Sequence, residues 1–67
     1  MKLDASVTRD IGRDTNRAGF VTGVVAMLHS LSVQVIAEGV AHADDAAALW
    51  RCGVDAQTGP WVSAQAG

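Results

Sequence analysis

Cysteine is almost absent from this chain, and so are the other devices that stabilise very small proteins. Cys52 is the single cysteine among 67 residues, which excludes an internal disulfide. The two histidines, His29 and His42, are scattered relative to it and give no zinc-binding spacing. A chain of this length buries only about 60% of the surface that its unfolded form exposes. We therefore expect a partner chain, or the rest of a larger protein, to stabilise it.

Basic charge and long apolar runs are also scarce. Five basic against seven acidic residues give a net charge of −2, which argues against DNA, RNA or a membrane surface as partners but allows a single anionic ligand. Every apolar stretch is far shorter than the roughly 20 residues that span a bilayer, and the N-terminus lacks a signal-peptide core. A free thiol suits a reducing compartment. We expect a cytoplasmic segment without direct membrane contact, which is compatible with a membrane anchor elsewhere in a parent protein.

The most informative stretch that is present covers residues 33–40, with the sequence VQVIAEGV. Its near-continuous run of β-branched residues predicts a strand that is covered on both faces. The run closes on Glu38 and Gly39, and the carboxyl end of a buried parallel strand is where α/β folds carry their chemistry. An alternative is that Glu38 simply begins a solvated loop.

Two helices are predicted from apolar residues at helical spacing. The first runs from about Asn16 to Ser30 after three N-cap candidates at 14–16, and its broad stripe should pack on a sheet. Gly19 and Gly23 in this helix either admit a neighbouring backbone or merely weaken the helix. The second helix has two aspartates in its first turn and Gly53 as its C-cap. The stripe residues are Ala18, Phe20, Val21, Val24, Val25, Met27, Leu28 and Leu31 in the first helix, and Ala46, Leu49 and Trp50 in the second.

The two ends of the chain complete the predicted order. Residues 2–4 fit a very short strand, and a turn of helix is expected within 5–13, before Gly12 interrupts it. Residues 53–62 predict a loop that enters a last short strand broken by Gly59 and Pro60, and residues 63–67 are expected to fray. The order is strand, helix, strand, helix, strand. This predicts one α/β domain over residues 1–67 with a βαβαβ topology, which has too few strands to close a barrel.

Three motifs in order resemble a known family. They are KLD at 2–4, HSL at 29–31 leading into VIAEGV at 35–40, and GVD at 53–55 followed by Gly59. Together they resemble the last third of the EAL domain, a bacterial domain that binds cyclic di-GMP and, when active, hydrolyses it to the linear dinucleotide. The resemblance implies the last three strand–helix units of a TIM-like (β/α)8 barrel, with the site at the carboxyl ends of the strands. The family's earlier metal-binding motifs are absent from this chain, so no cofactor is expected in it, and Mg²⁺ or Mn²⁺ would belong to the complete parent domain.

The resemblance assigns site residues one by one. Lys2 matches the family's active-site lysine beside the attacked phosphate, and Glu38 matches the glutamate of the AEGVE motif that helps to position or deprotonate the water. Gly39 and Thr58 complete the implied ligand-binding set, and no metal ligand is assigned. Without the resemblance, Lys2 reads as an exposed lysine at a strand end.

The chain also departs from the pattern of active members. Ala41 replaces the second glutamate of AEGVE, Thr58 stands at the position of a glutamine, and Pro60 and Ala64 replace a tyrosine and an arginine. Gln57 lies one residue early. In an extended segment its side chain would point away from the site, because successive side chains alternate between faces.

Other polar and aromatic residues have less specific interpretations. Asp4 has no chemical role beyond capping or pairing, and His29 suits a packing or capping role late in its helix. Trp61 is either a core or interface aromatic or a platform for a guanine base. His42 and Cys52 show no partner in the sequence.

Three functions are compatible with these residues. The leading hypothesis is a degenerate, receptor-like EAL domain that binds cyclic di-GMP in the parent protein without hydrolysing it. The first alternative is an active metal-dependent phosphodiesterase, and the second is a structural or interaction segment that binds no nucleotide. Taken alone, the chain is expected to lack enzyme activity and to be partly unfolded or associated with the remainder of the barrel or another copy.

Overall fold

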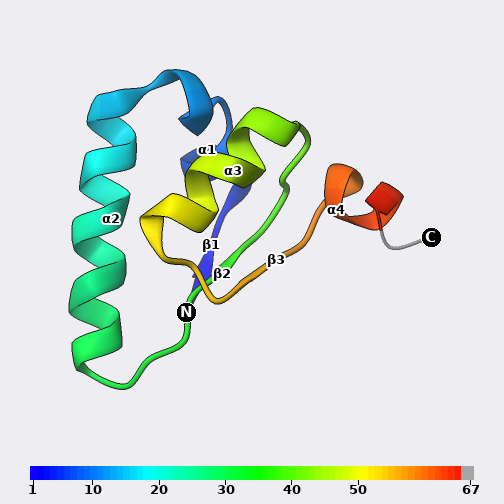
Figure 1. The fold of residues 1–67 in the computed structure, drawn as a ribbon. Helices are drawn as coiled ribbons and strands as arrows, with labels where there is room; N and C mark the ends of the chain where they lie inside the picture. Colours follow the sequence, from blue (N-terminus) through cyan, green and yellow to red (C-terminus); the bar gives the residue numbers. More distant parts are fainter. Residues whose placement is uncertain (66–67) are drawn as a thin grey trace.

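A small parallel sheet organises the structure, a computed structural model that describes residues 1–65 (Figure 1). The strands are β1 (Lys2–Leu3), β2 (Ile36–Ala37) and β3 (Ala56–Gln57). They pair in the order β1-β2-β3, with Leu3 beside Ala37 and Ala37 beside Gln57. The predicted βαβαβ order and the parallel sheet are therefore confirmed.

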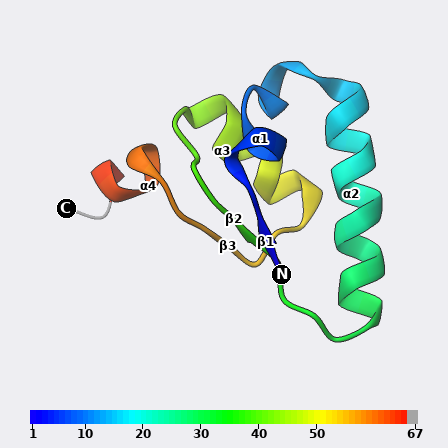
Figure 2. The ribbon, with the colours of Figure 1, turned by 180° about the vertical axis from the view of Figure 1, so that it is seen from behind.

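Helical segments connect and follow the strands. They are α1 (Ala5–Thr8), the 3₁₀ turn η1 (Ile11–Arg13), α2 (Thr15–Ser30), α3 (Ala43–Cys52) and α4 (Pro60–Gln65). In the view from behind, β1 lies in front of α3, α2 flanks the sheet, and α4 extends beyond β3 (Figure 2). Within residues 1–65, no helix is long and apolar enough to cross a membrane.

Helix α2 begins and ends where local chemistry directs it. Of the three N-cap candidates, Asp14 takes the role, and its Oδ1 accepts a hydrogen bond from the Arg17 N–H at 2.9 Å. One face of the helix is buried through Val21, Val25 and Leu28. Among residues 1–65, a Cβ at either Gly19 or Gly23 would meet no other group within 4 Å, so neither glycine serves a close approach by another segment of this part of the chain.

The predicted apolar stripes are broader than the buried faces. Phe20 is 69% exposed, and Met27, Leu31 and Trp50 are also more than half exposed. The prediction that Phe20, Met27 and Leu31 pack on the sheet is wrong for residues 1–65. Strands of two residues offer too little surface to cover a stripe that spans nearly half of a helix.

Helix α3 matches its predicted ends. Asp44 and Asp45 lie in its first turn, and Gly53 caps it with a φ of 99°, in the left-handed region that glycine adopts most readily. The Gly53 N–H donates to the carbonyl of Leu49 at 3.2 Å and closes the last turn. Leu49 is fully buried in the core between the helices and the sheet.

The strands differ from the predictions in length and position. The central strand is shorter than 33–40, and only one of its faces is fully covered: Val35 and Ala37 are buried, whereas Ile36 is half-buried. The last strand, expected to be broken by Gly59 and Pro60, ends before Gly59 and does not resume between Pro60 and Gln65. Pro60 begins α4 instead, because its fixed φ suits the first position of a helix.

The expected fraying at the C-terminus is also wrong as far as Gln65, which ends α4; the expectation for Ala66 and Gly67 lies outside the described residues.

Candidate functional site at the carboxyl edge of the sheet

The strand register gathers the sequence-predicted site positions on one face of the sheet. Leu3, Ala37 and Gln57 share the face that packs against the helices. Side chains alternate along a strand, so Lys2 belongs to the opposite face. Glu38 and Thr58 each follow the last residue of their strand, so by the same alternation their side chains lie on the face of Lys2, at the carboxyl edge. Lys2 lies further back on this face, level with Ile36; Lys2 and Thr58 are exposed, and Glu38 is half-buried.

Glu38 is held through its backbone on both sides. Its N–H donates to the Leu3 carbonyl of β1 at 2.9 Å, and its own carbonyl accepts from the Thr8 hydroxyl at 2.9 Å. The next residue, Gly39, has a φ of 73°. The half-buried carboxylate is therefore presented from a fixed main chain rather than from a free loop.

The end of β3 locks onto the same edge. The Thr58 N–H donates to the Ala37 carbonyl at 2.8 Å, and the Thr58 carbonyl accepts from the Val40 N–H at 2.9 Å. At Gly59 the φ is 135°, and an added Cβ would lie 2.3 Å from the Val40 nitrogen. The main chain of the β2–α3 loop therefore packs directly against the main chain at Gly59, with no room for a side chain between them.

Gln57 points away from this edge, as its position one residue early predicts. Its side chain is buried on the helix face, and its Nε2 donates to the Ala46 carbonyl of α3 at 2.9 Å. Its Oε1 is buried without a hydrogen-bond partner among the described residues. Thr58, and not Gln57, therefore occupies the open face at this strand end.

Asp4 caps a helix, one of the two minor roles expected for it. Its carboxylate accepts from the Ser6 N–H at 2.9 Å and so begins α1. This backbone bond, together with the Ser6 hydroxyl, lowers the pKa of Asp4 below its usual range.

His29 binds at the opposite, amino end of the sheet. Its Nε2 lies 2.7 Å from Oδ2 of Asp55, and the same oxygen accepts from the Val35 N–H at 2.7 Å. The Val35 bond and then the His29 contact lower the pKa of Asp55. His29 therefore does not cap α2, one of the roles expected for it. Its side chain instead links the end of α2 to Asp55, the residue before β3.

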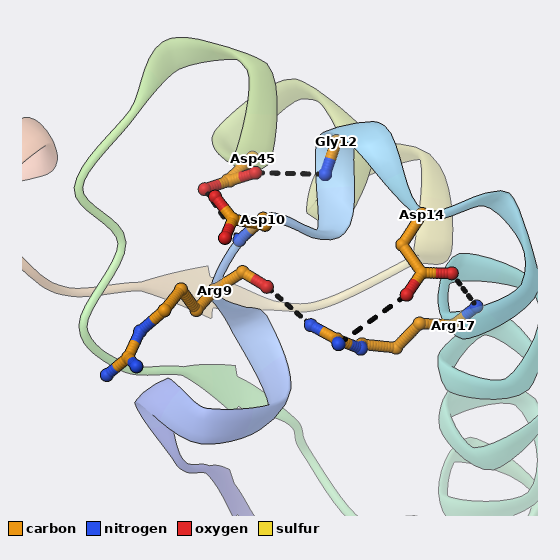
Figure 3. Close-up of polar contacts among 6 residues, drawn as sticks. All are labelled: Arg9, Asp10, Gly12, Asp14, Arg17 and Asp45. Atoms are coloured by element: carbon orange, nitrogen blue, oxygen red, sulfur yellow. Dashed lines mark hydrogen bonds and ion pairs between the residues drawn. The ribbon is translucent and has the colours of Figure 1, made fainter.

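A second polar cluster, which the sequence did not reveal, joins η1 to α3 (Figure 3). The buried Asp45 carboxylate accepts from the Gly12 N–H at 2.9 Å and from the Asp10 N–H at 3.3 Å. We call these three residues the Asp45 clamp. Sequence reasoning found only an acid in the first turn of a helix, because the two amide partners are more than thirty residues away.

An arginine anchors the same loop to α2. The Arg17 guanidinium donates to the Arg9 carbonyl and lies 3.5 Å from the Asp14 carboxylate (Figure 3). The segment between β1 and α2 is thus fixed to α2 and α3 on the carboxyl side of the sheet.

The remaining candidates have structural surroundings. Cys52 is buried, and its Sγ donates to the Ala18 carbonyl at 3.4 Å, so the expectation that it lacks a partner is wrong. Trp61 is half-buried against the core, which favours its packing role. His42 occupies the N-cap position of α3 without a side-chain capping bond.

A cavity of about 290 Å³ lies beside the clamp rather than at Lys2 and Glu38. Its lining mixes both charges and consists of Asp10, Arg13, His42, Ala43, Asp44 and Asp45. Residues 1–65 contain no group of three side chains able to hold a metal ion. The described residues therefore do not fit a divalent ion by themselves.

The fold and its carboxyl-edge site define the chain as part of a parallel α/β domain of the TIM-barrel type. The family profile of the EAL domain matches residues 1–65, and the chain belongs to this family. No curated protein matches it.

Two solved structures resemble the chain closely. Both are of the EAL enzyme Bd1971, one in a form bound to cAMP and cyclic di-GMP and the other bound to cGMP. In each comparison the sequence identity is 30%, the TM-score is 0.71, and the match covers 79% of this chain. The chain spans only 14% of the length of those proteins.

Proposed function

We propose that the complete EAL domain to which these residues belong binds cyclic di-GMP at the carboxyl edge of its sheet and does not hydrolyse it. Membership of the EAL family and the cyclic di-GMP-bound form of Bd1971 support the ligand. The position of Glu38, Gly39 and Thr58 at the carboxyl edge supports the site, with Lys2 on the same face, two residues further back and level with Ile36.

The register of β3 is the observation that most supports our proposal that hydrolysis is absent. The resemblance assigns the glutamine position of active members to Thr58, which lies on the exposed face, while the neighbouring Gln57 is buried and bonded to α3. Ala41, in place of the second glutamate, removes a further carboxylate from the adjoining loop. An edge with fewer groups to orient a water suits binding better than turnover.

The retained residues suit recognition of an anionic dinucleotide. The exposed Lys2 ammonium can donate to a phosphate oxygen, and the half-buried Glu38 carboxylate can accept hydrogen bonds from the ligand. Gly39 packs against Ala5 on the side where a Cβ would point, and it is otherwise exposed, so its main chain is open to a ligand. In a cytoplasmic signalling protein, such binding would bias an attached domain between two states.

An active phosphodiesterase is the second candidate, favoured by the retention of both Lys2 and Glu38 on one face. Mg²⁺ or Mn²⁺ would then require ligands from outside the described residues, since these contain no suitable cluster. In this case Glu38→Gln should lower turnover far more than binding.

A structural or interaction role without nucleotide binding is the third candidate. It is favoured by the exposed apolar side chains of Phe20, Met27, Leu31 and Trp50. Another part of the barrel or a second copy of the chain would cover them.

Two assays of the complete domain distinguish these candidates. Titration calorimetry with cyclic di-GMP measures binding, and chromatography of the nucleotide after incubation with Mg²⁺ or Mn²⁺ measures hydrolysis. We expect binding without linear product. Rapid appearance of the linear dinucleotide would refute the receptor, and absence of binding would favour the interaction role. Thr58→Gln tests the register directly, with Thr22→Gln on the exposed face of α2 as its matched control.

A further inference from the structure

Thr8 makes a long-range contact with the residue on which the proposed site depends. It is the last residue of α1 and only 1% exposed. Its hydroxyl lies 2.9 Å from the carbonyl of Glu38, thirty residues away, and 3.4 Å from the carbonyl of Ala5. A hydroxyl has one proton to donate, so the shorter contact, to Glu38, takes the hydrogen bond.

The segment that carries Thr8 also packs directly against the residue after Glu38. A Cβ at Gly39 would lie 2.5 Å from the Cβ of Ala5, the first residue of α1. The other side of Glu38 is fixed by its N–H bond to Leu3. Both peptide groups that flank Glu38 therefore have a hydrogen-bond partner, one in β1 and one in α1.

We propose that Thr8 is a positioning residue that orients Glu38 toward the ligand, an inference that rests on the proposed binding of cyclic di-GMP. Loss of the Thr8 hydroxyl would leave the Glu38 carbonyl without this partner. The peptide between Glu38 and Gly39 could then rotate, because glycine resists rotation less than any other residue. The half-buried carboxylate would lose its fixed direction while remaining chemically intact.

Three variants of the complete domain test this role through the dissociation constant for cyclic di-GMP. Thr8→Val keeps the shape of the side chain and removes the hydroxyl, and we expect affinity to fall about tenfold, the equivalent of one hydrogen bond. Thr8→Ser restores the donor and should recover affinity to within about twofold of the unmodified domain. Thr22→Val removes a similar hydroxyl that donates to the Ala18 carbonyl of α2, and it should leave affinity unchanged.

A double-mutant cycle with Glu38→Ala distinguishes positioning from a general effect on the fold. Once the carboxylate is gone, Thr8→Val should change affinity by less than about twofold. A tenfold loss that persists in the Glu38→Ala background would overturn the positioning role, and so would unchanged binding by Thr8→Val alone.

If the unmodified domain does not bind cyclic di-GMP, the proposed function fails, and the inference is decided by the carbonyl ¹³C chemical shift of Glu38. A shift that moves in Thr8→Val and returns in Thr8→Ser would retain Thr8 as the residue that orients Glu38. An identical shift in the unmodified domain, Thr8→Val and Thr8→Ser would refute the orienting role of Thr8.

Discussion

Removing the Asp45 carboxylate should loosen the loop between β1 and α2 more than any nearby change of charge. In the Asp45 clamp, one buried carboxylate serves two main-chain N–H groups of this loop from the first turn of α3. Asp45→Ala leaves both donors without that acceptor. It also removes a negative charge from the positive end of the helix dipole.

The expected loss is about 3 kcal/mol of unfolding free energy. The 2.9 Å bond from the Gly12 N–H has normal geometry and a charged acceptor, which makes it worth about 1.5–3 kcal/mol. The 3.3 Å bond from the Asp10 N–H is long and should add only about 0.5 kcal/mol. The dipole contributes about 0.3–1 kcal/mol.

Urea unfolding of the complete domain, followed by circular dichroism, measures this loss. Asp45→Asn keeps the shape and one oxygen acceptor, so about half of the loss should remain. Asp44→Ala is the matched control, because this exposed neighbour contributes only through the dipole and should cost less than about 1 kcal/mol. Equal losses for Asp45→Ala and Asp44→Ala would refute the structural importance of the clamp.

Two further predictions concern Gly59 and Asp55, which lie on either side of β3. Gly59→Ala should destabilise the fold by about 3 kcal/mol or more, because its Cβ would collide with the Val40 backbone. Gly23→Ala is the control: its Cβ would meet no other group among the described residues, and it should stabilise α2 by about 0.5–1 kcal/mol. The urea midpoints of the two variants should therefore move in opposite directions. Asp55→Asn should remove a pH-dependent part of the stability. Since the pKa of Asp55 is lowered in the folded state, its contribution is full above the usual value of 3.8 and is lost as the pH falls through the lowered pKa. Acid titration of unfolding should show the variant less stable at neutral pH and converging with the unmodified protein at low pH; a constant difference would contradict this.

Local signals in the sequence predicted the elements well. Asp14 caps the start of α2 and Gly53 caps the end of α3 through bonds to residues close by in the sequence. The sequence therefore predicted these two helix ends. The alternation of side chains in an extended segment likewise predicted that Gln57 points away from the site.

The sequence did not predict the features that depend on residues far away in the chain. The length of β2 is set by its pairing with β1 and β3, and the exposure of Phe20 is set by how much sheet α2 has to cover. Pro60 both breaks strands and begins helices, and its own residue type does not choose between them. The bonds of Thr8 and Asp45 join segments thirty or more residues apart, so they have no local pattern.

The main-chain bond of Thr58 also limits how a glutamine could arise at this position during evolution. No single-nucleotide change converts a threonine codon to a glutamine codon, and the two shortest routes pass through either lysine or proline. Proline has no N–H and would lose the bond that Thr58 donates to Ala37, so selection for a stable sheet disfavours that route. A lineage that acquires glutamine here is expected to pass through lysine, which would place a second cation on the same face as Lys2.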